Sequence, residues 1–504
     1  MAPSPTSSPH LPNSQCEELG FEWHLSASSI RPIKQLPDEL LLCIFNYVFR
    51  TEPRPSGSSF RSHAEWCNSM RYPILLSHIC SNWRQIAICS ATLWCRICIY
   101  PELFNHPGCV ALLEAYLNRA GQSLLDIFIL TSPHPGYPDT SVDCCVSDEF
   151  LTFLQTAVPR AKYLILKSER GLFSGEHPRR TLITCLDKCA PGTLAEITVD
   201  VATDDYPVSQ SLDMSLDLPR HKLEKLWQSV PVLRLNGYYP YAINTSDLGA
   251  NQGLTELRLK GCHPITETTL IGILTASPRL RVLEVSMDII GSLSKGSLIE
   301  PIHIETLEVV KSGIMNRPLT HQRQLRILLR LLQPGSKQLS LCISNPNHNS
   351  STEFVCQPEV RAFLARSNVR QLCVYDLESR SHLVELLKLI PSVRVLALSA
   401  LKSLEPDVNK VPTRPSLDAL YVIPSFLSLP PGVFLPPSSD WSTVEWLAET
   451  YKFPELTVWL QDFNFGYSPC LHSQELLIPE NFYSICPVVN VMSRETPNPA
   501  QEWC

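Results

Sequence analysis

Apolar residues recur along most of the chain in one short pattern: an apolar residue, two variable positions, a second apolar residue, one variable position and a third apolar residue. Copies of the pattern begin at Leu124, Ala161, Leu194, Val230, Leu254, Leu280, Ile304, Val369, Val393, Leu417 and Phe453, with a degenerate copy at Leu339-x-Leu341. Successive side chains of a strand point to opposite faces, so the second and third apolar positions share a face. Each copy therefore predicts a short strand with one buried face.

The spacing of the copies predicts stacked units. Copies between residues 254 and 304 are 26 and 24 residues apart, those between 369 and 417 are 24 and 24 apart, and other steps reach the thirties. Helical patterns such as Thr268–Ala276 lie between the copies, and prolines such as Pro278 end several of them. Neither a lone strand nor a lone helix can bury its apolar side. Neighbouring units should therefore stack into a parallel sheet backed by helices.

Two fold classes alternate strands and helices in this way, a leucine-rich-repeat solenoid and a doubly wound α/β fold. Short strands with one shared internal spacing favour the solenoid, and no glycine-rich strand-to-helix turn marks a nucleotide site. The asparagine or cysteine expected after each strand is nearly absent, Cys262 being the one good match, so irregular curvature is expected. We predict an α/β protein with an irregular solenoid over residues 101–460 and a C-terminal cap and tail over 461–504.

The variable position between the second and third apolar residues of each copy should point outward, to the concave side of the solenoid. That row contains Arg258, Glu284 and Glu308, together with the apolar Cys373 and Ala397. A protein bound in the concavity would contact this row. Arg258, Glu284 and Glu308 are therefore candidate target-facing residues, with a merely solvated face as the open alternative.

Two apolar helical segments precede the repeats. The first, Leu36–Phe49, has Pro37 at a position that suits a first helical turn and acidic residues directly after it. Its apolar residues form two overlapping stripes, Leu41, Ile44, Phe45 and Val48 in one and Leu40, Ile44 and Tyr47 in the other. A surface helix needs only one apolar stripe. The helix thus has more apolar surface than its own small domain can cover, which predicts that something else covers the rest.

The second helical segment runs from Ile74 to Trp94, and an insert rich in proline and serine, Thr51–Arg71, separates the two. One face of this segment collects Leu76, Ile79, Cys80, Trp83, Ala87 and Ser90. We predict a small all-α module over residues 31–100, preceded by a disordered segment over residues 1–30 that is rich in serine and proline.

The two segments together resemble the F-box. Residues Leu36–Phe49 match the pattern L-P-x-E-L-L-x-x-I-F, and Ile79–Trp94 match V/I-C-x-x-W-R-x-I-A followed by L-W. Many fungal F-box-like proteins combine such a module with a leucine-rich region. The resemblance implies a substrate-recognition adaptor of a Skp–cullin–F-box ubiquitin ligase. Its box would bind the Skp-type adaptor, and through it a cullin, while the repeats recruit a target protein.

The resemblance also implies which residues dock on the Skp-type adaptor or support the docking face: Leu36, Pro37, Leu40, Ile44, Phe45, Ile79, Trp83 and Leu93. Sequence alone does not separate the docking residues from the supporting ones.

Two other classes of function remain open. One is a ligase-independent scaffold that binds proteins through its repeats, and the other is a hydrolase or transferase hidden in an irregular α/β fold.

Composition and sequence motifs limit which other functions the chain could have. The chain has 504 residues and a net charge of -7, which argues against a general binder of nucleic acid or of membrane surfaces. No apolar stretch is long enough to cross a membrane and no signal peptide is evident, so a cytoplasmic or nuclear location with reduced cysteines is expected. Nucleotide-binding, hydrolase and zinc-protease motifs are absent. We interpret Cys95-x-x-Cys98 as buried thiols and predict no enzyme activity, metal or cofactor.

Overall fold

The computed structural model describes residues 33, 36–51, 63–131, 147–168, 176–190, 192–201, 229–236, 253–261, 264–291, 300–312, 318–344, 357–375, 380–399, 417–423, 441–451, 454–459, 484, 486 and 488–492. The segment expected to be disordered, residues 1–30, lies outside this range, as do residues 52–62 of the expected insert.

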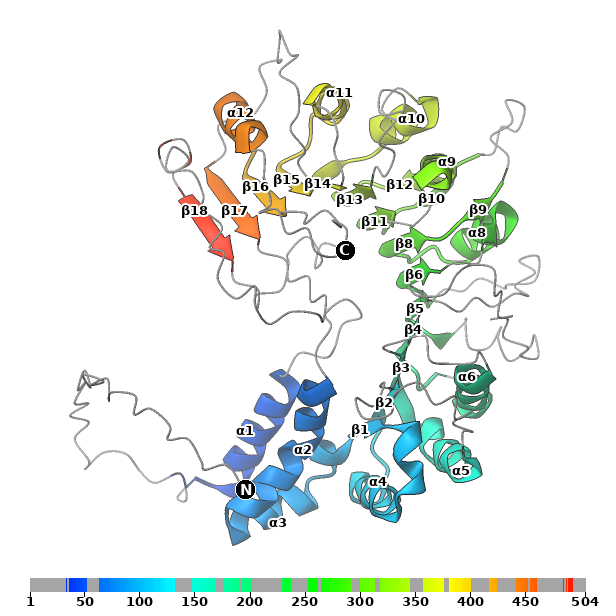
Figure 1. Ribbon diagram of the computed structural model, residues 1–504, viewed down its shortest axis with the longest axis vertical. Coiled ribbons are helices and arrows are strands. Elements are labelled where there is room, and N and C mark those ends of the chain that lie inside the picture. Colours follow the sequence, from blue (N-terminus) through cyan, green and yellow to red (C-terminus); the bar gives the residue numbers. More distant parts are fainter. Residues whose placement is uncertain are drawn as a thin grey trace, which may run out of the picture.

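One long parallel sheet runs through the molecule and curves into an arc (Figure 1). Its 14 strands are β1 (Arg96–Ile99), β2 (Leu125–Thr131), β3 (Ala161–Ser168), β4 (Glu196–Val201), β5 (Val232–Asn236), β6 (Glu256–Lys260), β8 (Val282–Ser286), β11 (Val309–Ser312), β13 (Leu339–Ser344), β14 (Val369–Tyr375), β15 (Val395–Ser399), β16 (Ala419–Ile423), β17 (Glu455–Trp459) and β18 (Val488–Met492). Each strand pairs with its neighbours in chain order. A doubly wound sheet reverses its strand order at a switch point, so the architecture is solenoid-like, as the repeat spacing predicts.

Helices cover the convex side of the arc (Figure 1). They are α4 (Pro107–Ala120), α5 (Asp148–Ala157), α6 (Glu176–Lys188), α8 (Glu267–Thr275), α9 (Pro318–Leu331), α10 (Pro358–Arg366), α11 (Arg380–Leu389) and α12 (Trp441–Tyr451). Short 3-10 turns occur at Ala91–Trp94, Pro101–Asn105 and Val158–Arg160. Two small parallel pairs accompany the main sheet, β7 (Ile265–Thr266) with β9 (Ile289–Ile290) and β10 (Ile302–Ile304) with β12 (Leu332–Pro334).

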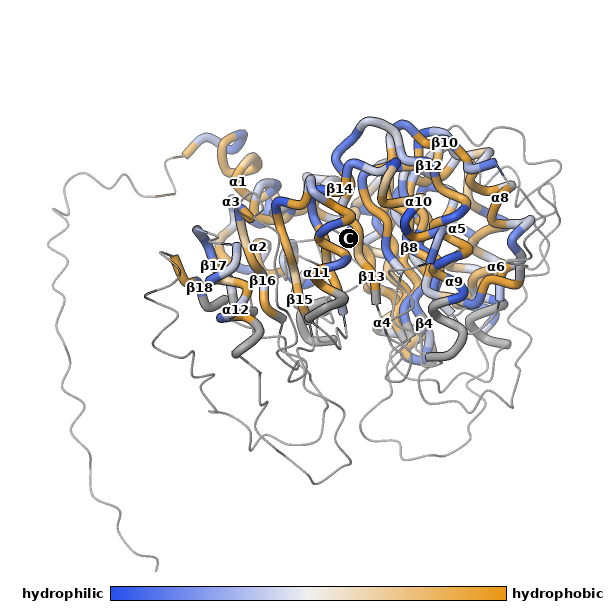
Figure 2. Tube along the Cα trace, turned by 90° about the horizontal axis from the view of Figure 1, so that it is seen from above, coloured by the Kyte–Doolittle hydropathy of each residue, from blue (hydrophilic) through white to orange (hydrophobic). Residues whose placement is uncertain are grey.

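A single continuous apolar core lies between the sheet and the helices, from Leu41 in the first helix to Cys486 before the last strand. Within β6 the repeat pattern works as predicted, because Leu257 and Leu259 are buried on the helix side while Arg258 faces the other way, half-buried. Figure 2 shows hydrophobic residues running through many of the strands and through the first helix. The same two-residue alternation repeats along the sheet.

Two copies of the pattern have a different register from the predicted one. The copy assigned to Ile304 is wrong, because Ile304 lies in β10 and the main strand β11 places Val310 beside Leu283. The true copy is Leu307-x-x-Val310-x-Ser312, and the polar third position hid it. The degenerate copy at 339–341 is one residue short. The register accordingly shifts where Leu339 pairs with β14.

Strands at both ends of the sheet extend beyond the range 101–460 that we assigned to the repeats. β1 lies in the range assigned to the helical module and follows the same pattern as Trp94-x-x-Ile97-x-Ile99. β18 lies in the range assigned to a cap and tail, and Cys486-x-x-Val489-x-Val491 fits the pattern there. The solenoid and the helical module therefore share residues and a core.

Three helices form the N-terminal part: α1 (Asp38–Thr51), α2 (His63–Ile79) and α3 (Ser81–Cys89). The prediction of one helical face from Leu76 to Ser90 is wrong, because the helix is interrupted at Cys80, whereas the short turn expected at Leu93 and Trp94 is present. The backbone of Cys80 is extended, and its sulfur accepts a hydrogen bond from the Trp83 amide, so Cys80 caps the start of α3. The insert also ends earlier than expected, since α2 already begins at His63.

Candidate functional site

Helix α1 divides its apolar residues between two adjacent faces. Leu41, Phe45 and Phe49 are buried in the core. Leu40 and Ile44 on another face are 51% and 43% exposed, and the exposed apolar residues of α1 also include Tyr47 and Val48. Side chains four residues apart lie above one another on a helix, so the buried and exposed sets form two separate stripes. We call Leu40, Ile44, Tyr47 and Val48 the α1 outer stripe.

Aromatic contacts fix the buried stripe of α1 to the other helices. The Phe45 ring meets the Trp83 ring edge-on, with 4.7 Å between their centroids. The Phe49 ring stacks on Tyr72 at 6.2 Å, and the Arg96 guanidinium lies 4.4 Å above the Phe49 ring. Such pairs add to the stabilisation that burial alone provides.

Polar contacts hold both ends of α1. Near its start, the Asn82 amide donates a hydrogen bond to the Asp38 carboxylate at 3.0 Å. Near its end, the Thr92 hydroxyl donates to the side-chain oxygen of Asn46 at 2.7 Å. The orientation of the α1 outer stripe is thus fixed by α3 and by the turn that follows it.

The helices are anchored to the solenoid through Trp94. Its ring is fully buried and its indole N–H donates to the Ala87 carbonyl at 2.7 Å. The Tyr116 ring packs edge-on against it at 4.8 Å, and the Arg119 guanidinium lies 4.3 Å above it. Because Tyr116 and Arg119 belong to α4, the first solenoid helix, the N-terminal helices and the solenoid form one packed body.

The structure separates the predicted docking and supporting residues by exposure. Pro37, Leu40, Ile44 and Ile79 are exposed, Leu36 and Trp83 are half-buried, and Phe45 and Leu93 are buried. The prediction that Trp83 is a structural anchor agrees with its packing on Phe45. Before the solenoid, the large exposed apolar side chains that the predicted docking set does not contain are Ile33, Tyr47, Val48, Leu75 and Ile88. Of these, only Tyr47 and Val48 carried a sequence signal, through the two apolar stripes.

The concave face carries one residue from every strand of the sheet in a single register row. In chain order the row is Cys98, Phe128, Ile165, Thr198, Arg234, Arg258, Glu284, Lys311, Cys342, Cys373, Ala397, Tyr421, Thr457 and Asn490. The row begins with apolar residues, becomes charged in its middle third and continues with two buried thiols. We call it the concave row.

The predicted neighbours Arg258 and Glu284 do lie side by side in the concave row. Glu308 does not belong to it, and the prediction that places it there is wrong. Because the register of β11 differs from the predicted one, Lys311 occupies that place. The Glu308 carboxylate instead pairs with the Arg281 guanidinium at 2.6 Å.

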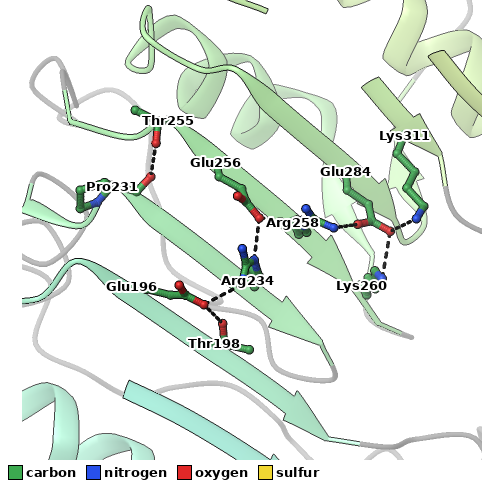
Figure 3. Close-up of polar contacts among 10 residues, drawn as sticks. All are labelled: Glu196, Thr198, Pro231, Arg234, Thr255, Glu256, Arg258, Lys260, Glu284 and Lys311. Atoms are coloured by element: carbon green, nitrogen blue, oxygen red, sulfur yellow. Dashed lines mark hydrogen bonds and ion pairs between the residues drawn. The ribbon is translucent and has the colours of Figure 1, made fainter. Parts of the chain in front are cut away.

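Ion pairs connect the charged part of the concave row across five strands (Figure 3). The Glu256 carboxylate lies between Arg234 and Arg258, at 2.5 Å and 2.6 Å from their Nε atoms. A second Arg234 nitrogen is 2.6 Å from Glu196, and an Arg258 nitrogen is 3.4 Å from Glu284. These residues, with Lys260 and Lys311, form what we call the concave ion network.

Glu284 is the most deeply buried member of the concave ion network. Burial by itself raises the pKa of a carboxyl, but the cations of Lys311, Lys260 and Arg258 outweigh it, and the pKa of Glu284 is lowered. The ammonium of Lys260 is 2.9 Å from its carboxylate and that of Lys311 is 3.8 Å away. The pKa of Glu256 is lowered in the same way, with burial opposed by Arg234 and Arg258. Both carboxyls are therefore ionised at neutral pH.

The two thiols of the Cys95-x-x-Cys98 segment lie in different clusters. Cys95 packs half-buried against the main core and its thiol donates to the Ala91 carbonyl at 3.2 Å, whereas Cys98 is buried among concave-face residues. Burial raises the pKa of the Cys95 thiol. This placement agrees with the interpretation as buried thiols. In the described part of the chain, no group of three or more histidine, cysteine or acidic side chains is arranged to hold a metal ion, and no helix is long and apolar enough to cross a membrane.

Comparison with known proteins gives only weak similarity to solved structures. No known protein family matches the chain, and a search of curated proteins finds no match either. A similar solved structure is the crystal structure of the Rad7 and Elc1 complex in yeast, with 14% identity and a TM-score of 0.32, covering 84% of this chain and 88% of that one. A TM-score this low supports no argument about function.

Proposed function

We propose that this protein is a substrate-recognition adaptor of a Skp–cullin–F-box ubiquitin ligase. The observation that carries the proposal is the α1 outer stripe, four exposed apolar side chains on a helix whose adjacent stripe is buried in the core. The sequence resemblance of this helix to the F-box names the partner that would cover it, a Skp-type adaptor protein. Exposed apolar patches commonly mark protein–protein interfaces.

In this proposal the chain itself makes and breaks no bonds. The α1 outer stripe binds the Skp-type adaptor and, through it, a cullin, while the concave face of the solenoid holds the target. Tethering raises the effective concentration of the target near the loaded ubiquitin-conjugating enzyme. Because the Trp94 anchor joins the helices to the solenoid, the geometry between the two binding surfaces is fixed. A cytoplasmic or nuclear location belongs to the same proposal.

Co-purification with a Skp-type adaptor tests the docking role. The full chain and the adaptor are expressed together, and the chain carries either Leu40→Asp with Ile44→Asp, or Leu124→Asp with Ile290→Asp as the matched control. All four side chains are large, apolar and exposed, but the control pair lies on the solenoid. We expect the α1 pair to abolish co-purification and the control pair to preserve it.

The proposal would be overturned if the α1 variant retained the adaptor and showed the same thermal unfolding profile as the natural chain. The alternative is a scaffold that binds proteins through its repeats without a ligase. It predicts that the α1 variant keeps every partner that affinity purification recovers from the native cell.

A further inference from the structure

The members of the concave ion network differ in exposure. Glu284 is 1% exposed, whereas Lys260, paired with it, is 35% exposed. Arg234 and Arg258 are each 20% exposed, and Lys311, Glu256 and Glu196 lie between 14% and 15%. A solute entering the concavity therefore meets Lys260 and the two arginines more readily than the carboxylates. Figure 3 shows these side chains on neighbouring strands.

The carboxylates fix the positions of those cations. Glu256 binds the Nε atoms of two arginines at once, and Glu284 lies within ion-pair distance of Arg258 and of two lysines. The network holds four cationic and three carboxylate side chains and so carries one net positive charge, on a chain whose net charge is -7. Side chains that are already ordered lose less entropy on binding. The network is a prearranged cationic island on an acidic protein.

The cations are spaced to match an extended peptide. Arg234, Arg258 and Lys311 lie in the concave row, and the first and last are three strand spacings apart, about 14 Å. Side chains at positions i and i+4 of an extended chain are also about 13–14 Å apart and point the same way. Two carboxylates of a peptide crossing the strands could therefore meet Arg234 and Lys311 together, with a third near Arg258.

We infer that the concave ion network binds an acidic, extended segment of a partner protein, with its carboxylates on Arg234, Arg258 and Lys260 or Lys311. Under the proposed function this names the class of target that the repeats recruit. Glu284 lies between the cations of the row and disfavours a further carboxylate at that point. The bound segment therefore carries acidic residues alternating with neutral ones. Nucleic acid fits less well, because its continuous phosphate charge would meet the three carboxylates.

Fluorescence anisotropy with the purified full chain tests this inference without the adaptor. The probe is a fluorescein-labelled peptide of alternating glutamate and serine, and its counterpart has glutamine in place of glutamate. We expect saturable binding of the glutamate peptide at low ionic strength, weakened by added salt, and no binding of the glutamine peptide. Lys260→Glu should weaken binding about tenfold or more by reversing a charge at the surface of the network.

Arg281→Glu is the matched control, because it makes the same change of charge and Arg281 is a more exposed, ion-paired cation at a strand start outside the network. It should bind the peptide nearly as the natural chain does. Absence of saturable binding, equal binding of the glutamine peptide, or equal weakening by Lys260→Glu and Arg281→Glu would each overturn the inference. Tighter binding of a single-stranded thymidine oligonucleotide would also overturn it. If the natural chain co-purifies with the adaptor but does not bind the peptide, this inference alone is refuted. If the chain binds the peptide but not the adaptor, the proposed function is refuted and this inference is not.

Discussion

Leu40 and Leu41 are consecutive leucines on α1 that provide a sharp test of the two-sided helix. Leu40 is 51% exposed and Leu41 is fully buried. If the interpretation is right, the same substitution to alanine has opposite consequences at the two positions. One variant should lose binding and keep its stability, and the other should lose stability and keep its binding.

The magnitudes follow from burial. Truncating a buried leucine to alanine removes apolar contacts and leaves a cavity, so Leu41→Ala should lower the free energy of unfolding by about 2–5 kcal/mol. Full burial of a leucine side chain contributes about 1.5–3 kcal/mol, and roughly half of the Leu40 surface remains to be covered. Leu40→Ala should therefore cost about 1 kcal/mol of adaptor binding, about a fivefold rise in Kd. Its effect on unfolding should stay within about 0.5 kcal/mol.

Urea denaturation of the isolated chain gives the free energy of unfolding, and calorimetric titration with a Skp-type adaptor gives the Kd. Binding is measured at a temperature at which Leu41→Ala is fully folded, so that unfolding does not imitate weak binding. Equal destabilisation by the two variants would refute the assignment of the two faces. An unchanged Kd for Leu40→Ala would refute docking through the α1 outer stripe.

Three further predictions concern the stability of the solenoid. Gly335→Ala should unfold at a clearly lower temperature in differential scanning calorimetry, because a Cβ atom there would lie 2.5 Å from the backbone Cα of Glu305. Gly108 has open space around it, so Gly108→Ala should have a neutral or slightly stabilising effect in the same experiment. Glu284→Gln should lower the free energy of unfolding by about 1–3 kcal/mol in urea, because it leaves half-buried cations without their carboxylate. A loss below about 0.5 kcal/mol would contradict the role of the network. The contribution of Glu284 to the free energy of unfolding should also depend on pH, because its pKa is lowered in the folded state. This contribution is complete above the ordinary carboxyl pKa of 4.5 and is lost as the pH falls below that value. The natural chain should therefore lose more stability than Glu284→Gln between about pH 5 and about pH 3, and parallel losses in that range would refute this assignment.

Local patterns along the chain determined most of the architecture. The spacing of apolar residues predicted short strands, intervening helices and a solenoid-like order, because alternation of side chains in a strand requires no knowledge of distant residues. The same reasoning predicted that Arg258 and Glu284 share a face, and that α1 has more apolar surface than the core can cover. Each of these conclusions rests on residues within a few positions of one another.

Tertiary structure decided the register and the neighbours. The apolar pattern predicted a strand copy beginning at Ile304. Only the pairing of Val310 with Leu283 and Leu341 corrects it, and this places Lys311 rather than Glu308 in the concave row. Sequence likewise did not separate Leu40 from Phe45, since both are apolar residues of one amphipathic helix. Burial depends on which surface a partner helix covers: the Trp83 ring from α3 packs on Phe45, which is buried, whereas Leu40 is exposed. Contacts between residues far apart in the chain make these choices, and no local pattern encodes them.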